Sequence, residues 1–410
     1  MKPYIIPFEQ LKNTDVALVG GKNASIGEMI SSLASLGVSV PGGFATTSHA
    51  YRDFLAQARL DERIRTALAS LDVDDVERLA VVGKEIRGWM LATPFPTRLN
   101  EEVLDDNAFL AQCYGNHEDR ERMFFDALEK TPQGLCACVF DTTDRVQHMF
   151  WRYLDKDHPA VRDMPQDQKP RVIQDLYDRM DTLVGRVMQQ IDDQTLLLVI
   201  SDHGFKSFNR CMNLNAWLHQ NGYLVLKDGK GESGDWFEDV DWSRTRAYTM
   251  GLNGLYMNIK GREREGIVEA GAEAEALKEE LRGKLDGLVD PASGKVGITG
   301  MFDCDAVYAG PYVDNAPDLI VGYGEGFRAS WDSVMGKVTT AIFEDNLKAW
   351  SGDHCVDPRL VPGVLFSNRK IAIEKPAIVD VAPTVMKLFG LELPMYFDGK
   401  PWAVAAGGGK

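Results

Sequence analysis

Apolar residues recur every three to four positions over several long stretches of the chain, which is the period of a helix with one buried face. In the first stretch, Ile26, Met29 and Ile30 share that face with two leucines, and Gly37 supplies the helix end. The same period predicts helices over residues 51–68, 107–130, 169–191 and 380–388. A surface helix over residues 269–288 is predicted from its Ala, Glu and Lys content.

Short apolar runs without polar alternation lie between these helices, and they predict strands. The runs are residues 15–19, 135–140, 195–200, 319–321 and 363–366. The run 195–200, which has no polar alternation, is typical of a strand that is buried on both faces of a parallel sheet. Since the helix 169–191 connects 135–140 to 195–200, the right-handed crossover rule places both runs in one parallel sheet, with the loops that follow them at the same edge.

The predicted fold is therefore α/β, a mostly parallel sheet flanked by helices, preceded by a small α+β part. A change of character after Pro94-Phe95-Pro96 predicts domains over 1–98 and 99–402, with a small tail over 403–410. Residues 207–264 are predicted to form an insertion or cap. In it, Asn258, Lys260 or Arg262 could contact a substrate phosphate, or the cluster could be a solvated loop.

Composition narrows the class of protein. The 410 residues carry a formal net charge of −16, which argues against a nucleic-acid binder because such proteins present a basic surface. No apolar run reaches the roughly 18 residues of a membrane span, and the start of the chain does not read as a signal peptide. The six cysteines contain no CxxC pair. These features predict a cytoplasmic, reduced protein with no membrane partner.

Acidic residues and histidines follow the predicted strands. Asp202 and His203 come directly after 195–200, Asp144 and His148 are one helical turn apart after 135–140, and His354 precedes 363–366. Because open α/β sheets place ligands beyond the carboxyl ends of their strands, these side chains are candidate metal ligands. Asp144, His148 and His354 give three ligands and leave one position open, which is the number of protein ligands typical of catalytic metal sites. Asp202 and His203 would begin a second site.

Simpler interpretations of the same residues stay open at this point. Asp202-His203 could be a capped turn, and Asp144 with His148 could be an exposed pair that supports a helix. The remaining four histidines lie in polar, helical or loop contexts and are predicted to be on the surface: His49, His117, His158 and His219.

A second candidate site lies near the N-terminus. Gly20-Gly21-Lys22 stands between a predicted strand and a predicted helix, where backbone N–H groups and the helix dipole can bind phosphate. The P-loop spacing GxxxxGK[ST] is absent, so Lys22 could equally be an ordinary loop lysine.

The wider stretch is more specific. Residues 19–29, with the segment 37–47 that contains Val40-Pro41-Gly42-Gly43-Phe44, closely resemble the opening of phosphoenolpyruvate synthase and pyruvate phosphate dikinase, and Lys84-Glu85-Ile86-Arg87 fits the continuation. The resemblance implies that Lys22 and Arg87 contact ATP phosphates in an ATP-grasp-type domain. It stops near Pro96, so most of the nucleotide pocket is expected to be missing and Lys22 to be exposed.

Residues 99 to 402 resemble the C-terminal part of the alkaline phosphatase superfamily, in its type I phosphodiesterase/nucleotide pyrophosphatase branch. The motifs that carry the resemblance are Asp141-Thr-Thr-Asp144-Arg-Val-Gln-His148, Ser201-Asp-His-Gly204, Gly352-Asp-His354 and the segment 380–390. It implies that Asp144, His148 and His354 hold one divalent ion, and that Asp202 and His203 help to hold another.

The sequence departs from that family in one respect. The family's N-terminal part supplies a further Asp ligand and a Ser/Thr nucleophile, and neither has a counterpart here, so the catalytic nucleophile is unknown. The chain joins parts of two families near residues 96–103. A rearranged gene and an assembly error would both produce such a junction.

Three functions remain possible from sequence. The first is a metal-dependent hydrolase of small-molecule phosphate esters, impaired by the missing nucleophile, with one tightly bound Zn or Mn ion and an incomplete second site. The alternative is an ATP-binding, phosphotransferase-related protein, with ATP as ligand only if the N-terminal part is competent. The third is a catalytically inactive fusion. The oligomeric state is unknown.

Overall fold

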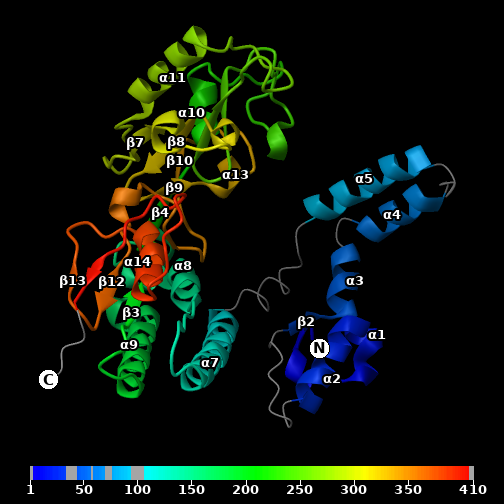
Figure 1. Ribbon diagram of the computed structural model, residues 1–410. Coiled ribbons are helices and arrows are strands. Elements are labelled where there is room, and N and C mark those ends of the chain that lie inside the picture. The colour runs from blue at the N-terminus through cyan, green and yellow to red at the C-terminus, as the bar shows by residue number, and fades with distance from the viewer. Residues whose placement is uncertain (1–2, 34–43, 57–58, 70–75, 94–105, 406–410) are drawn as a thin grey trace. The chain divides into compact units, whose positions relative to one another are not determined.

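The computed structural model describes residues 3–33, 44–56, 59–69, 76–93 and 106–405 (Figure 1). The chain is a mixed α/β protein with several small sheets, and it divides into two compact units, Met1–Arg145 and Val146–Lys410. The domain boundary that the sequence places at 98/99 lies outside the described residues. No helix in the described part of the chain is long and apolar enough to cross a bilayer.

The first unit combines one small sheet with helices. Strands β1 (Ile5–Pro7) and β2 (Phe44–Thr46) pair antiparallel. The helices are η1 Phe8–Gln10, η2 Asn13–Asp15, α1 Val16–Val19, α2 Gly21–Leu33, α3 Ser48–Ala56, α4 Leu60–Ala69, α5 Val76–Ala92 and α7 Asp106–Lys130. A small core of Leu11, Val19, Ala24 and Ala45 lies under α2 and β2. The unit therefore has the expected α+β character.

The predicted strand 15–19 is wrong, because these residues are helical. Val16–Val19 form α1, which ends when the amide of Gly20 donates to the carbonyl of Val16 at 2.9 Å. Only Val19 of this helix is buried, so a short apolar run does not by itself distinguish a strand from a helix. Gly20 then takes a φ of +81°, which lets the chain turn directly into α2.

The predicted strand 135–140 is also wrong, because these residues pair with no strand in the described structure. Phe140 packs instead on α7, with its ring 6.0 Å from that of Phe124 and 5.4 Å from that of His117. Val139 remains 80% exposed. An apolar run shows that a segment can pair, but pairing also needs a neighbouring strand.

The second unit contains most of the secondary structure. Its helices are α8 Thr142–Leu154 (which begins just before the division), η5 Pro159–Val161, η6 Gln166–Gln168, α9 Val172–Gln190, α10 Leu214–Gln220, η7 Asp235–Phe237, α11 Ala272–Leu285, α12 Cys304–Val307, η8 Val313–Asn315, α13 Trp331–Val334, η9 Pro358–Leu360, η10 Ile378–Asp380 and α14 Val381–Leu388. Its strands are β3 Leu198–Ile200, β4 Lys206–Met212, β5 Ala247–Met250, β6 Gly254–Met257, β7 Ile298–Asp303, β8 Leu319–Tyr323, β9 Gly326–Ala329, β10 Phe343–Asp345, β11 Gly352–Asp353, β12 Leu365–Ser367, β13 Ile371–Ala372 and β14 Ala403–Val404.

The mostly parallel sheet predicted from sequence is not present in the described structure. One four-stranded sheet has the order β5-β6-β8-β7 and is antiparallel throughout. In the other, β4 pairs antiparallel with β10 and β11, and its pairing with β9 is the one parallel ladder among the described strands. The runs 195–200 and 363–366 do form neighbouring strands, β3 and β12, but they are antiparallel, with Ile200 opposite Leu365. Apolar content predicted that both runs are strands and could not give their partner or direction.

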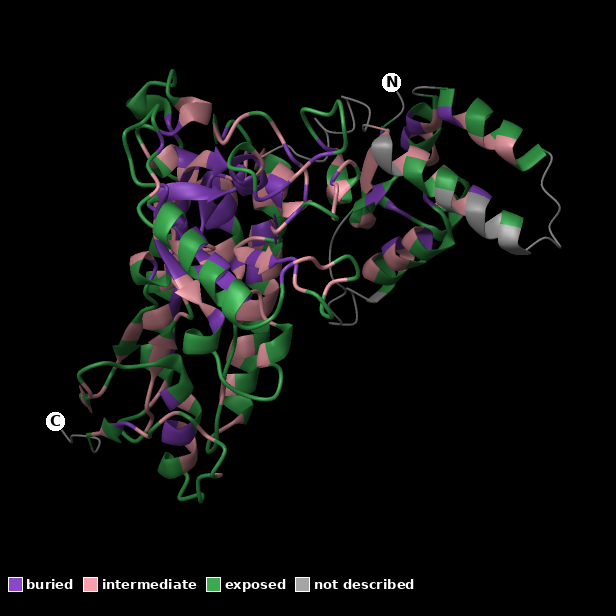
Figure 2. Cartoon of the chain, turned by 90° about the horizontal axis from the view of Figure 1, so that it is seen from above, coloured by how far each residue is buried: buried purple, intermediate pink, exposed green. Residues whose placement is uncertain are grey.

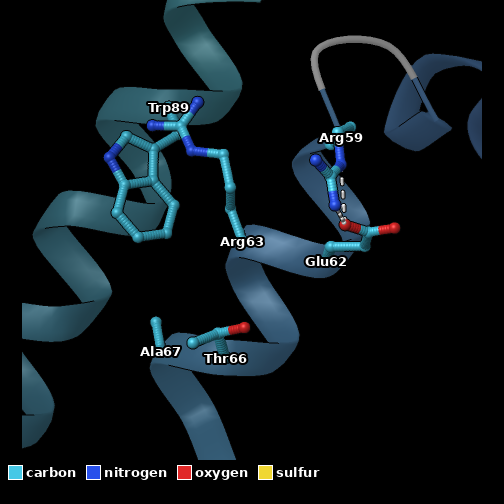
Figure 3. A pocket seen from close by; sticks show the side chains of 6 residues that line it. All are labelled: Arg59, Glu62, Arg63, Thr66, Ala67 and Trp89. Carbon is cyan, nitrogen blue, oxygen red and sulfur yellow. Dashed lines mark hydrogen bonds and ion pairs between the residues drawn. The ribbon is translucent and has the colours of Figure 1, made fainter.

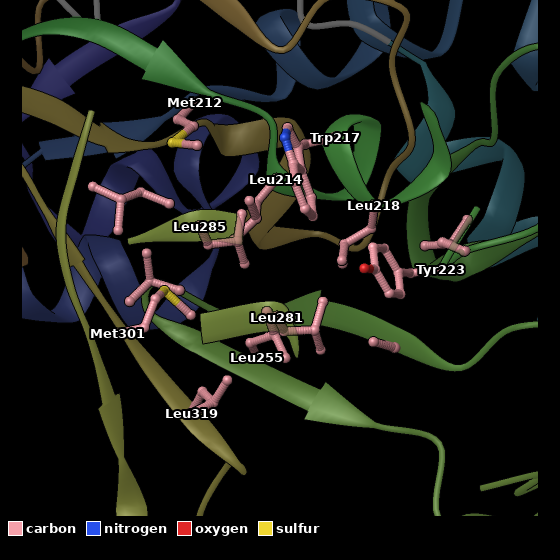
Figure 4. Close-up of a cluster of buried hydrophobic side chains, with 14 of the residues drawn as sticks. Met212, Leu214, Trp217, Leu218, Tyr223, Leu255, Leu281, Leu285, Met301 and Leu319 are labelled. Atoms are coloured by element: carbon pink, nitrogen blue, oxygen red, sulfur yellow. The ribbon is translucent and has the colours of Figure 1, made fainter. Parts of the chain in front are cut away.

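The main hydrophobic core lies on the sheet β5-β6-β8-β7, between it and helices α10 and α11 (Figure 4). The buried positions of α11 are Ala274, Leu277, Lys278, Leu281 and Leu285, which follow the helical period. The four apolar ones belong to one cluster with Leu214 and Leu218 of α10 and Leu255 of β6. Buried residues gather in the second unit, whereas most residues of α4 are exposed (Figure 2).

The C-terminal segment is held by Asp380. This residue stands at the start of α14, as predicted, but its carboxylate does not cap that helix. It accepts hydrogen bonds from the amides of Ala377 and Lys400 and from the indole of Trp402. Residues 403 and 404, predicted as the beginning of a tail, pair with β13 as strand β14.

Candidate functional site

Helix α8 and strand β11 bring three of the predicted ligands together. Asp144 and His148 are one turn apart on α8, and His354 follows β11. One ligand atom from each of the three lies within 4.8 Å of the others. His148 is buried, whereas Asp144 and His354 are partly exposed. Asp144 and His354 are 210 positions apart in sequence (354 − 144), so they are close together only in the folded chain.

The orientation of His148 suits a metal ligand. Its Nδ1 lies 2.8 Å from the carbonyl oxygen of Gly352. Because a carbonyl can only accept, Nδ1 carries the proton and Nε2 keeps its lone pair for a ligand. The ring of Trp350 stacks on the imidazole, with centroids 3.9 Å apart, and the edge of Phe205 contacts it from another side. The ring is therefore fixed on three sides.

His354 is held through the residue that precedes it. The carboxylate of Asp353 is buried and accepts the amides of His354 and Cys355, each at 2.8 Å. It also accepts the indole N–H of Trp350 at 2.8 Å and forms an ion pair with Arg328. Burial opposes ionisation of this group, but Arg328, the amide of Cys355 and the indole of Trp350 outweigh it and hold the pKa of Asp353 below its ordinary value. Asp353 therefore remains a carboxylate.

Asp202 and His203, the predicted start of a second metal site, lie beside the first group. The imidazole of His203 stacks on that of His354, with centroids 3.6 Å apart. Its Nε2 is 3.5 Å from the carboxylate of Asp202, whose side chain is 78% exposed. Among the described residues, no group of three possible ligands includes either of them.

The first group fits a divalent ion in number and type of donors. A tetrahedral ion about 2.0–2.2 Å from its ligands needs donor atoms about 3.3–3.6 Å apart. The separations of up to 4.8 Å require only small side-chain movements to reach that spacing. Two imidazoles and a carboxylate suit Zn, Mn or Fe, and would leave a position for water or substrate.

Lys22 and Arg87, predicted from the resemblance to contact ATP phosphates, are both exposed. Lys22 is the second residue of α2, where the N-terminal amides of the helix have no intrahelical acceptor. A Cβ built on Gly20 or Gly21 would meet no atom within 4 Å, so the turn before Lys22 faces open space. Arg87 lies on α5.

A shallow hollow between α4 and α5 is a separate feature of the first unit (Figure 3). The guanidinium of Arg63 lies over the ring of Trp89, 4.6 Å from its centroid, and Arg59 donates to Glu62. Neither Lys22 nor Arg87 is among the residues that line it. Arg63 and Arg59 already have these partners, so we interpret the hollow as a result of helix packing and not as a binding site.

Several sequence interpretations of single residues are wrong. His117 and His158, predicted on the surface, are fully buried. The Nε2 of His158 lies 2.9 Å from the carbonyl of Phe208, so the side chain joins η5 to β4. Arg262, considered as a phosphate contact, forms a bidentate ion pair with Asp318. Polar sequence context does not reveal Phe208 or Asp318 as partners, because each lies 50 or more positions from the residue that it contacts.

Trp350, Gly352 and Asp353 have roles that sequence reasoning missed, although they belong to the motif around His354. The sequence signal that could have indicated these roles is the presence of an aspartate and a tryptophan close to a candidate ligand. Their contacts with α8 and β9 depend on the fold and could not be read from the motif.

Comparison with known proteins identifies the N-terminal part. Residues 16–120 match the family model described as pyruvate phosphate dikinase, AMP/ATP-binding domain. The chain is 65% identical over 100 residues to the phosphoenolpyruvate synthase of Neisseria meningitidis, a match that covers 24% of this chain and 13% of that enzyme. It is 55% identical over 116 residues to the Pseudomonas aeruginosa synthase, covering 28% and 14%. For the Escherichia coli synthase the identity is 46% over 161 residues, covering 36% and 20%.

These matches limit what is shown. They span a fifth or less of each of these synthases. None of the three relatives is a phosphatase or a phosphodiesterase. The synthase-like resemblance is thus confirmed for the N-terminal part, and the phosphatase-like resemblance of residues 99–402 finds no support in them.

Proposed function

We propose that the chain is an ATP-binding, phosphotransferase-related protein, and that its N-terminal part binds the phosphates of ATP. The observation that carries this proposal is the match of residues 16–120 to an AMP/ATP-binding domain. The open turn at Gly20-Gly21 and the exposed Lys22 on the first turn of α2 support it, because amide groups and a cation there can bind an anion together.

The proposed binding is weak and directed at phosphate. The matched part covers 13–20% of the synthases, so most of a nucleotide pocket is not expected from it. Binding through Lys22, Arg87 and helix amides would recognise a polyphosphate and little of the adenine base. Inorganic tripolyphosphate should therefore bind with about the same affinity as ATP and displace it.

Isothermal titration of the full chain with ATP tests the proposal. Lys22→Ala should weaken binding about 10- to 150-fold, since one charge-assisted hydrogen bond contributes about 1.5–3 kcal/mol. Lys12→Ala is the matched control, because Lys12 is an exposed lysine of the same unit outside the α2 turn. The proposal fails if the wild-type chain takes up no ATP at millimolar concentration, or if both variants lose the same affinity.

A second candidate function is metal-dependent hydrolysis of phosphate esters, favoured by one observation, the approach of Asp144, His148 and His354. The three residues would hold one Zn or Mn ion, whose chemistry when bound is to polarise a phosphoryl oxygen and acidify water. His148 would keep Nε2 directed to the ion through its bond to Gly352. Asp202 and His203 would bind a second ion weakly.

Metal content and turnover test this candidate. The purified chain should retain one Zn or Mn ion after dialysis, and His148→Ala should lose it together with any slow hydrolysis of an aryl phosphodiester. His219→Ala serves as control, since His219 lies on α10 and bonds to Leu224. Absence of bound metal in the wild-type chain would refute the candidate, and a trapped phosphoseryl or phosphothreonyl intermediate would show that a nucleophile had been missed.

A further inference from the structure

The segment from Trp350 to His354 contacts both imidazoles of the candidate metal centre. Within five residues, the Trp350 ring stacks on His148, the Gly352 carbonyl accepts from Nδ1 of His148, and His354 supplies the other imidazole. The position of this short segment therefore decides whether the two imidazoles meet.

Asp353 holds that segment in place from inside. One of its oxygens, Oδ1, accepts the amides of His354 and Cys355, and the other, Oδ2, accepts Nε1 of Trp350. Trp350 and His354, which contact the candidate centre, are thus both bonded to one carboxylate, which is 1% exposed.

Arg328 fixes the carboxylate in turn. Its Nε lies 2.5 Å from Oδ2 of Asp353 in an ion pair, and its own side chain is 3% exposed. The guanidinium donates to the carbonyl of Ala329 and lies over the ring of Trp331, 4.3 Å from the centroid. Since Arg328 belongs to β9, the segment is anchored to the sheet that contains β4 and β11.

From these contacts we infer that Asp353, held by Arg328, is a positioning residue for the metal centre and is not itself a ligand. The inference rests on the proposed metal centre. Asp353 also belongs to a second group of possible ligands, with His354 and Cys355. Its two oxygens, however, already receive three hydrogen bonds and an ion pair, so little of its lone-pair capacity remains for an ion.

Asp353→Asn tests the positioning role in the full chain. Asparagine can still accept the two amides, but it presents an NH₂ group to Arg328 and Trp350, which are both donors. The affinity for Zn²⁺, measured by titration calorimetry, should fall about 10- to 100-fold, the effect of losing an outer partner of metal ligands. The visible spectrum of bound Co²⁺ should also change, since the imidazoles are displaced.

Asp357→Asn is the matched control. Asp357 is equally buried, bonds to an arginine and a backbone amide, and lies only four residues away, but it contacts Arg359 and Thr299 and not the centre. This variant should lower stability but leave the Zn²⁺ affinity within about 3-fold of the wild-type value. The Co²⁺ spectrum should stay unchanged. If Asp353→Asn does not fold, Trp350→Phe retains a ring for His148, removes the donor to Asp353, and should weaken Zn²⁺ about 3- to 10-fold.

The possible outcomes separate the inference from the proposal beneath it. A wild-type chain that binds no Zn²⁺ overturns the metal centre and the positioning role together. Wild-type binding that Asp353→Asn leaves within about 3-fold overturns the positioning role alone. A thiolate-to-cobalt absorption band that disappears in Cys355→Ser would show that the ion sits on Asp353, His354 and Cys355, and would likewise overturn it.

Discussion

Gly352 is the residue at which β11 comes closest to α8. A Cβ at this position would lie 2.6 Å from the carbonyl oxygen of Gln147 and 2.7 Å from Cβ of Trp151, distances that side chains do not adopt. The absence of a side chain thus permits the hydrogen bond between its own carbonyl and His148. At the scale of single residues, a glycine is as important to the candidate centre as the ligands are.

Gly352→Ala should therefore separate β11 from α8. We expect the free energy of unfolding to fall by about 2 kcal/mol, as for other overpacked sites, and Zn²⁺ affinity to fall at least about 10-fold. Urea denaturation and metal titration measure the two effects. Gly185→Ala on α9 is the control, because a Cβ there meets nothing within 4 Å and should raise stability by about 0.5–1 kcal/mol. Unchanged metal affinity in Gly352→Ala would contradict this account.

At the scale of elements, an ion pair connects two strands to the loop before β7. Arg210 of β4 donates to Asp290 at 2.9 Å and to Asp345 of β10 at 2.8 Å. Asp290 is fully buried and also accepts from Ser293. Burial alone would raise the pKa of Asp290, but the hydrogen bonds from Ser293 and Arg210 outweigh it and lower the pKa from its ordinary value of 3.8.

This pair predicts a pH dependence of stability. Because the folded-state pKa is lowered, the pair stabilises the protein at pH values above the unfolded-state pKa, and the contribution is lost as the pH falls through the folded-state value. Asp290→Asn should lower the free energy of unfolding at pH 7 by about 2 kcal/mol. This is less than the roughly 3–5 kcal/mol for breaking a fully buried pair, because Arg210 still pairs with Asp345 in the variant.

The comparison at several pH values decides this prediction. The difference between Asp290→Asn and wild type in urea denaturation should narrow as the pH falls from 7 towards about 3. Asp228→Asn, at a fully exposed aspartate, should change stability by less than about 0.5 kcal/mol at any pH. A constant difference across the pH range would show that ionisation of Asp290 does not contribute.

At the scale of the whole molecule, the chain divides into two compact units. The matched residues 16–120 belong to the first unit, and His148 and His354 belong to the second. The proposed ATP contact and the metal centre are therefore separate hypotheses, supported by different observations and tested with different variants. Failure of one leaves the other standing.

Sequence patterns were sufficient to predict several of the longer helices and to select the candidate ligands. The predicted helices 107–130 and 169–191 correspond to α7 and α9, because a periodic apolar face is a local property. The helix 269–288, predicted from its Ala, Glu and Lys content, corresponds to α11. The spacing of Asp144 and His148 likewise placed both on one face of α8, since it depends only on the helical repeat.

The tertiary structure alone decided strand direction, burial of polar groups and positioning of the ligands. Runs 195–200 and 363–366 became an antiparallel pair, and 135–140 paired with no described strand, because pairing depends on which distant segment lies alongside. The contact of His158 with Phe208 and that of Arg328 with Asp353 join residues far apart in the chain. The bond from the amide of His354 to Asp353 depends on a backbone conformation that the fold sets. Such contacts are properties of the folded chain, and no local pattern of residue types specifies them.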